Sequence, residues 1–151
     1  MPLTTVSKAA DRLFQSGFVR DKVAIIWHAG EPLVVGVDYL RASVETIQQT
    51  AASYSKDECY QFGIQTNATL IDHTWVDFFD QFNFRVGISI DGPAFLHDSM
   101  RITRAGEGTH GKALRGLRMV KERGLNMNVI CVLTDQSLDY VHEIHDFFAE
   151  E

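Results

Sequence analysis

The chain has 151 residues, of which 45% are hydrophobic and 23% are charged, so it is long enough to bury one hydrophobic core. Its 14 lysines and arginines against 20 aspartates and glutamates give a formal net charge of -6, which argues against a broad nucleic-acid-binding surface. No stretch approaches the roughly 18 uncharged apolar residues of a membrane span, and the N-terminus lacks a secretory pattern. We therefore expect a cytoplasmic protein that binds neither membranes nor nucleic acid.

The first half of the chain predicts a helix followed by two strands with a helix between them. Residues 4–14 are amphipathic and predict the first helix, and residues 22–27 predict a strand because β-branched and aromatic residues follow one another there. Apolar residues three and four positions apart predict the next helix: Val37, Leu40, Val44 and Ile47. Residues 60–65 predict the second strand.

The second half repeats this alternation. Residues 84–90 and 127–133 predict the third and fourth strands, separated by a helix with apolar residues at Leu114, Leu117 and Val120. A last helix is expected to open at Ser137, with one apolar face: Leu138, Val141, Ile144 and Phe148.

Alternating strands and helices predict an α/β fold, with a parallel sheet covered by helices on its outer face. A closed eight-stranded barrel usually takes about 250 residues, so four strands predict a partial (β/α) barrel in one incomplete domain, residues 1–151. The chain begins on a helix, and we expect that a preceding strand is missing. Such an open arc would expose a sheet edge, which predicts self-association or pairing with a partner chain.

Functional groups are expected in the loops at the carboxyl ends of the strands. After the first strand, Ala29 and Gly30 would let a ligand approach the backbone, and the carboxylate of Glu31 would suit a ligand ammonium group. An ordinary strand-to-helix turn is the alternative. After the second strand, residues 65–67 carry three hydrogen-bonding side chains, for which helix capping is the alternative.

The segment after the third strand, residues 89–111, is predicted to be a long polar loop that concentrates Asp91, His97 and Arg101. Loops longer than about 12 residues inside compact domains are more often functional. The guanidinium of Arg101 is suited to bidentate binding of a carboxylate.

Two other kinds of site remain open at this point. The loops at the strand ends hold His28, His97 and His110, which raises a metal site, although their spacing matches no ligand pattern. Glu31 and Asp91 could also serve as the acid and base of a hydrolase.

The motifs HAGEPL, QTNATL and GISIDGP, followed by HDxxR and GxGT, occur in this order between residues 23 and 133. Together they resemble the radical S-adenosylmethionine (SAM) family, in particular the anaerobic sulfatase-maturating enzymes and the SPASM-type maturases of ribosomal peptides. The resemblance implies SAM and a 4Fe-4S cluster as cofactors and a protein or peptide as substrate. It also implies reductive cleavage of SAM to a 5'-deoxyadenosyl radical, which abstracts hydrogen from the substrate.

The resemblance further implies roles for individual residues. The loop of Ala29, Gly30 and Glu31 would bind the amino group of SAM's methionine moiety. Ser89 and Arg101 match the family's serine and arginine that contact the SAM carboxylate.

Asn67 matches the asparagine of the family's Thr-Asn-Gly motif, and His28 falls where related maturases often carry a residue that faces the substrate peptide. Two family glycines are alanines here, Ala29 and Ala68. If these positions need a positive φ, alanine costs about 1 kcal/mol or more. We then expect Ala29→Gly to tighten SAM binding.

The family's CxxxCxxC motif, whose thiolates hold the cluster, does not occur in these 151 residues. Cys59 and Cys131 are far apart in the sequence and cannot replace it, because a cluster needs thiolates that lie together. We therefore expect a fragment of a radical SAM enzyme that keeps part of the SAM site and is inactive alone. The alternative is a noncatalytic α/β binding or interaction module derived from the same fold.

Overall fold

The computed structural model describes all 151 residues and contains one sheet of four parallel strands in the order β1-β2-β3-β4. The strands are β1 (Val23–Trp27), β2 (Tyr60–Thr66), β3 (Arg85–Ser89) and β4 (Met127–Ile130). In the pairing register, Gln65 lies opposite Gly87 and Ser89 lies opposite Ile130. The predicted arc of four parallel strands is confirmed.

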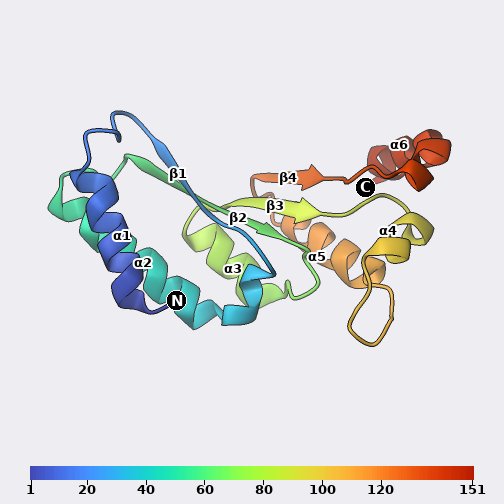
Figure 1. Ribbon diagram of the computed structural model, residues 1–151, viewed down its shortest axis with the longest axis horizontal. Coiled ribbons are helices and arrows are strands. Elements are labelled where there is room, and N and C mark those ends of the chain that lie inside the picture. Colours follow the sequence, from blue (N-terminus) through green and yellow to red (C-terminus); the bar gives the residue numbers. More distant parts are fainter.

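Four helices cover one face of this sheet (Figure 1). They are α1 (Leu3–Gln15), α2 (Val37–Ser53), α3 (His73–Gln81) and α5 (His110–Glu122). The short helix α4 (Ala94–Met100), the 3-10 helix η2 (Asp135–Tyr140) and helix α6 (Val141–Glu150) lie beyond the carboxyl ends of β3 and β4. A second 3-10 helix, η1 (Pro32–Val35), follows β1. None of these helices combines the length and the apolar character that crossing a bilayer requires.

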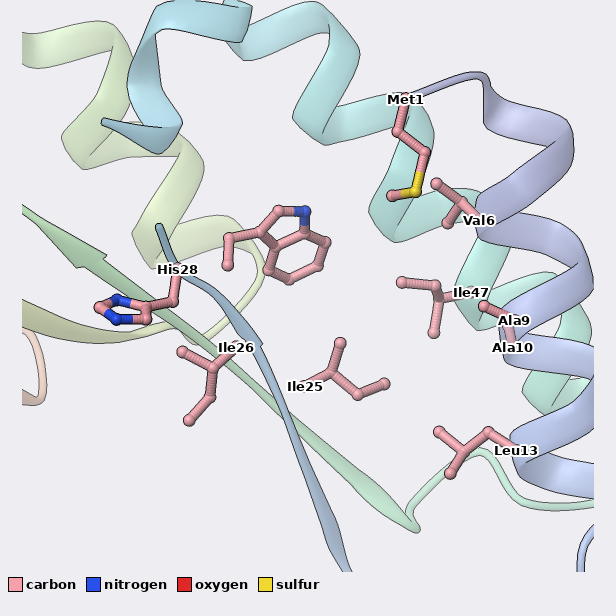
Figure 2. A pocket seen from close by; sticks show the side chains of 10 residues that line it. Met1, Val6, Ala9, Ala10, Leu13, Ile25, Ile26, His28 and Ile47 are labelled. Atoms are coloured by element: carbon pink, nitrogen blue, oxygen red, sulfur yellow. The ribbon is translucent and has the colours of Figure 1, made fainter. Parts of the chain in front are cut away.

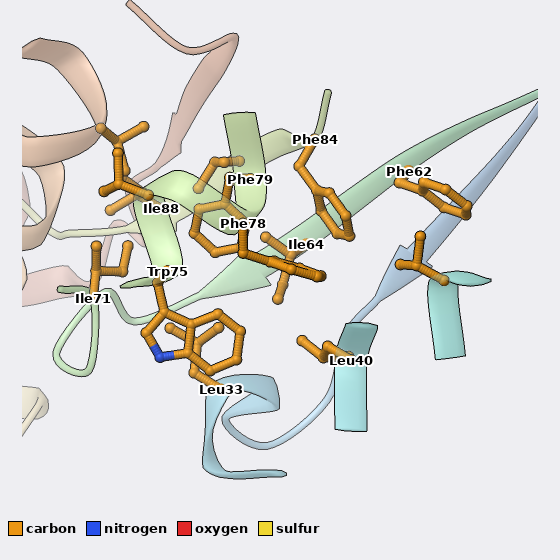
Figure 3. Close-up of a cluster of buried hydrophobic side chains, with 14 of the residues drawn as sticks. Leu33, Leu40, Phe62, Ile64, Ile71, Trp75, Phe78, Phe79, Phe84 and Ile88 are labelled. Carbon is orange, nitrogen blue, oxygen red and sulfur yellow. The ribbon is translucent and has the colours of Figure 1, made fainter. Parts of the chain in front are cut away.

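The hydrophobic core lies between the outer face of the sheet and these four helices. Every second residue of the inner strands points into it, among them Phe62, Ile64 and Ile88, and the aromatic rings of α3 pack against them (Figure 3). The ring of Phe78 lies 5.2 Å from that of Phe84, and Phe79 lies 5.6 Å from the same ring. One continuous cluster of 23 buried residues joins all four helices, so the chain has a single core.

The inner face of the sheet is not covered by any helix of this chain. Ile26 is 60% exposed, and Arg85 and Asn128 are also exposed. A shallow cavity of about 290 Å³ lies over this face, and its floor includes two glycines on neighbouring strands, Gly63 and Gly87. The strands therefore present an apolar outer face and a more polar, accessible inner face.

The edge of β1 borders an apolar groove of about 340 Å³ between this strand and α1 (Figure 2). Its lining residues come from α1, α2, β1 and the N-terminus: Met1, Val6, Ala9, Ala10, Leu13, Ile25, Ile26, Trp27, His28 and Ile47. β1 has a hydrogen-bonded neighbour on one side only. The expected exposed edge is therefore present in this chain.

Three sequence predictions about the C-terminal half were wrong. Residues 89–111 do not form one irregular loop, because they contain α4 and an isolated bridge between Ile102 and Gly108. β4 ends at Ile130 instead of residue 133. The last α-helix begins at Val141 instead of Ser137, because a capping box between Thr134 and Ser137 starts the separate 3-10 helix η2.

This change of helix type also alters which residues are buried. A 3-10 helix has three residues per turn instead of 3.6, so apolar positions chosen with α-helical spacing do not stay on one face. Leu138, expected on the apolar face of the last helix, lies in η2 and is 59% exposed. Val141 is the first residue of α6, which has no fully buried residue, and is 57% exposed.

Candidate functional site

The carboxyl ends of neighbouring strands are joined by polar side chains, starting with Glu31 between β1 and β2. Glu31 caps η1 by accepting a hydrogen bond at Oε1 from Leu33 N at 3.0 Å. The same oxygen accepts from Thr66 Oγ1 at 2.7 Å, and Oε2 accepts from Asn67 N at 2.9 Å. The sequence placed Glu31 and Asn67 in separate loops, and the fold brings them into contact.

The turn before Glu31 has an unusual backbone. Ala29 has φ 82 and Gly30 has φ 62, and both residues are exposed, as is the neighbouring His28. Ala68, in the turn after β2, has φ 59 and is fully buried. Ala29 and Ala68 therefore both occupy the left-handed region, which is strained for a residue with a Cβ atom.

The turn after β2 also uses the side chain of Asn67 locally. Asn67 Oδ1 accepts hydrogen bonds from Thr69 N at 3.0 Å and from Thr69 Oγ1 at 2.7 Å, as in an Asx turn. Helix α5 packs closely on this turn, because a Cβ atom on Gly116 would lie 2.3 Å from the carbonyl oxygen of Ala68. The oxygen of Asn67 thus has a local structural role in a turn, and its amide nitrogen has no protein partner. The helix-capping alternative was wrong for this residue, because the side chain of Asp72 caps the next helix, α3.

Gln65 joins the ends of β2 and β3. Its Nε2 donates a hydrogen bond to Ser89 Oγ at 2.9 Å across the inner face of the sheet. The sequence pattern indicates Gln65 only as one of three polar residues after the second strand. Its position two residues after Gly63 puts it on the inner face and is the sequence signal that could have identified it.

Asp91, just after β3, forms an ion pair with Arg101 and also accepts a hydrogen bond from the segment that follows β4. Arg101 Nε lies 2.5 Å from Asp91 Oδ2 and Nη2 lies 3.1 Å from Oδ1, which also accepts from Val132 N at 2.9 Å. The Arg101 side chain is 27% exposed and that of Asp91 10%. Burial alone raises the pKa of Asp91, but hydrogen bonds from Arg101 and Val132 and the positive charge of Arg101 bring it below its ordinary value.

His97 is fully buried, and its ring is hydrogen-bonded to residues at both ends of the segment between β3 and α5. Its Nδ1 accepts from Asp91 N at 3.2 Å, and its Nε2 lies 3.0 Å from Thr109 Oγ1. Because the Thr109 hydroxyl donates to the carbonyl oxygen of Arg101, Nε2 must donate to Thr109, which makes His97 the neutral Nε2–H tautomer. Burial lowers the pKa of His97, which agrees with a neutral ring.

The geometry contradicts the histidine metal site. Both ring nitrogens of His97 are hydrogen-bonded to protein groups, and His28 lies at the rim of the groove beside β1. No group of three or more histidine, cysteine, aspartate or glutamate side chains is arranged to hold a metal ion. The acid and base pair is not supported either, because both oxygens of Asp91 are hydrogen-bonded to protein groups, Arg101 and the backbone of Val132.

The two cysteines do not fit a 4Fe-4S cluster. Cys59 precedes β2 at the amino end of the sheet, whereas Cys131 follows β4 at the carboxyl end. Cys131 is half-buried, and this burial raises the pKa of its thiol. A cluster needs several thiolates that converge on it, so these residues cannot provide its ligands.

A comparison with protein families finds a match that spans all of these strand-end residues. The family described as the Radical SAM superfamily matches residues 6–148. The chain belongs to the radical SAM superfamily. The resemblance noted in its sequence is thereby confirmed.

Relatives of this radical SAM chain include sulfatase-maturating enzymes. An uncharacterized protein of Synechocystis sp. is 38% identical over 99% of this chain and 38% of its own length. The serine-type anaerobic sulfatase-maturating enzyme of Bacteroides thetaiotaomicron is 33% identical over 85% of this chain and 30% of its own length. The matched part of this chain thus spans 38% and 30% of the lengths of these two relatives.

Solved structures show the same arrangement of strands and helices. The enzyme anSMEcpe with bound AdoMet (SAM) and the Cp18Cys peptide has a TM-score of 0.90 and 25% identity to this chain. The match covers 99% of this chain and 40% of that one, and the structure with AdoMet alone has a TM-score of 0.91. The predicted radical SAM type of fold and its sulfatase-maturating branch are both confirmed.

Proposed function

We propose that this chain forms part of the SAM-binding site of a radical SAM enzyme that modifies a protein or peptide. The observation that carries the proposal is the line of polar contacts along the carboxyl edge, in which Glu31, Ser89 and Arg101 each keep hydrogen-bonding capacity that no protein group uses. In this proposal the methionine moiety of SAM lies along that edge.

The charges of Glu31 and Arg101 are opposite to those of the ammonium group and the carboxylate of SAM's methionine moiety. All three hydrogen-bond donors to Glu31 are neutral, so its negative charge remains available to the ammonium group of SAM. Arg101 uses Nε and Nη2 on Asp91, which leaves Nη1 for the carboxylate of SAM, together with the hydroxyl of Ser89. Ala29 and Gly30 are exposed beside Glu31 and let the ligand approach the backbone.

The binding experiment is calorimetric titration of SAM into the wild-type chain, Glu31→Gln and the control Glu45→Gln. Glu45 is an exposed residue of α2 with no hydrogen-bond partner, so it carries the same change of charge without the site. We expect Glu31→Gln to weaken SAM binding about ten-fold or more, because a hydrogen bond to a charged group is lost. Equal affinity of the two variants would remove the role of Glu31. No binding by the wild type would instead favour the noncatalytic interaction module.

We also propose that these 151 residues do not cleave SAM by themselves, because Cys59 and Cys131 lie at opposite ends of the sheet. Anaerobic reconstitution with iron and sulfide should give no stable cluster, and mass spectrometry should detect no 5'-deoxyadenosine after addition of SAM and a reductant. A cluster or 5'-deoxyadenosine would contradict this part of the proposal.

Contacts with a peptide substrate are proposed for His28, which is exposed next to the Ala29 turn. The apolar groove beside β1 leads us to propose further that a second copy of the chain pairs with this edge. Light scattering should then show species larger than a monomer, reduced by Ile26→Lys in the groove. Val34→Lys should not reduce them, because Val34 is exposed but lies outside the groove. A sharp monomer peak for the wild type would contradict the pairing.

A further inference from the structure

The side chain of Gln65 crosses from β2 to β3 over a residue that has no side chain. Gln65 lies opposite Gly87 in the pairing register. A Cβ atom added to Gly87 would lie 2.0 Å from Gln65 Oε1 and 2.9 Å from its Cδ. Only glycine at this position leaves room for the amide to lie against β3. The absence of a side chain at Gly87 therefore allows Gln65 to reach Ser89.

The hydrogen bond between Gln65 and Ser89 has a defined direction. The amide nitrogen Nε2 of Gln65 can only donate, so the oxygen of Ser89 accepts. No protein group accepts the hydroxyl hydrogen of Ser89. Since a hydroxyl has one hydrogen, that hydrogen remains for an acceptor outside the protein.

We propose that Gln65 is a positioning residue, which turns the Ser89 hydroxyl so that its hydrogen points to the carboxylate of SAM. This inference rests on the proposed function, in which Ser89 contacts that carboxylate. Gln65 itself acts through Ser89, and its amide does not need to touch the ligand.

Because Gln65 donates the hydrogen bond to Ser89, substitutions that remove or reverse the donor can distinguish a positioning role from a packing role. In Gln65→Met the side chain keeps a similar length but donates nothing, so the Ser89 hydroxyl is free to rotate. In Gln65→Glu the carboxylate accepts from Ser89, which turns the hydroxyl hydrogen away from the ligand and adds a negative charge. The affinity for SAM should therefore fall in the order wild type, Gln65→Met, Gln65→Glu.

The experiment is calorimetric titration of these variants with two probes, SAM and decarboxylated SAM, which lacks the carboxylate. Gln65→Met should bind SAM about five-fold more weakly than the wild type and bind decarboxylated SAM equally well. Gly87→Ala, whose Cβ displaces the Gln65 amide, should show the same selective loss. Gln61→Met is the matched control, because Gln61 lies on the same face but donates to the backbone of Asn83.

The outcomes distinguish the inference from the function on which it rests. If the wild type binds SAM and Gln65→Met loses affinity equally for both probes, or for neither, the positioning role is overturned while the SAM site stands. If the wild type does not bind SAM, the proposed function fails first and the inference with it. Thermal melting of each variant checks that a loss of affinity is not a loss of fold.

Discussion

The loops after β1 and β3 each hold a carboxylate that accepts three hydrogen bonds and joins neighbouring strand ends. Glu31 accepts from two backbone N–H groups and one hydroxyl, all neutral. Asp91 accepts two of its three from the guanidinium of Arg101. Similar geometry thus leaves the first carboxylate with its charge uncompensated and the second with its charge paired inside the protein.

The difference separates a binding carboxylate from a structural one. A ligand ammonium group is attracted to the uncompensated charge of Glu31, whereas Asp91 already has its partner. Asp91 also fixes the plane of the Arg101 guanidinium, so that the remaining nitrogen is held at the edge of the sheet. The two loops therefore contribute to the proposed site through different residues, Glu31 itself and the arginine that Asp91 holds.

The largest effect on stability should come from the paired carboxylate. Asp91→Asn leaves a partly buried guanidinium without its partner, which should lower the free energy of unfolding by about 3 kcal/mol. Glu31→Gln removes hydrogen bonds between neutral donors and the carboxylate and should cost about 1 kcal/mol. Urea denaturation measures both values, with the exposed Asp21→Asn as a control. Equal losses at Asp91 and Glu31 would contradict the comparison.

The free energy of unfolding should also depend on pH, through Asp91 and His97. The folded-state pKa of Asp91 is below its ordinary value of 3.8, so its contribution to stability is complete above that value and is lost as the pH falls through the lower folded pKa. The pKa of His97 is also lowered, so the unfolded chain binds a proton first and stability already declines below about pH 6.5.

Urea titrations at pH 7, 5 and 3 measure both parts of this decline. Asp91→Asn should show a smaller decline between pH 5 and pH 3 and keep the decline between pH 7 and pH 5, because His97 stays buried. A wild-type free energy of unfolding that does not change with pH would contradict both assignments.

The two strained alanines should have smaller effects than the loss of Asp91. Ala29→Gly should raise the free energy of unfolding by about 1 kcal/mol, because Ala29 is exposed and only its φ of 82 is relieved. At Ala68 the same relief is offset by the loss of a fully buried methyl group, worth about 0.8 kcal/mol or more. Thermal melting should therefore show a gain for Ala29→Gly and little change for Ala68→Gly.

Much of the fold followed from local sequence patterns, because each strand is a short run of β-branched and aromatic residues. The nearness of Glu31 and Asn67 was also predictable, since carboxyl ends of parallel strands meet at one edge. The Gln65–Ser89 bond was not, because it depends on the register between β2 and β3. Nor was the Asp91–Arg101 pair, because α4 folds the intervening residues back and the sequence suggested a loop instead.

The central claim is that the carboxyl edge of this sheet binds the methionine moiety of SAM. Titration of the 15N-labelled chain with SAM, followed by two-dimensional NMR, tests it most directly. The account predicts saturable shifts concentrated at the backbone amides of Gly30, Asn67 and Ser89, with residues at the amino ends of the strands, such as Arg85, unchanged. Saturable shifts confined to other surfaces, or none at all, would contradict it.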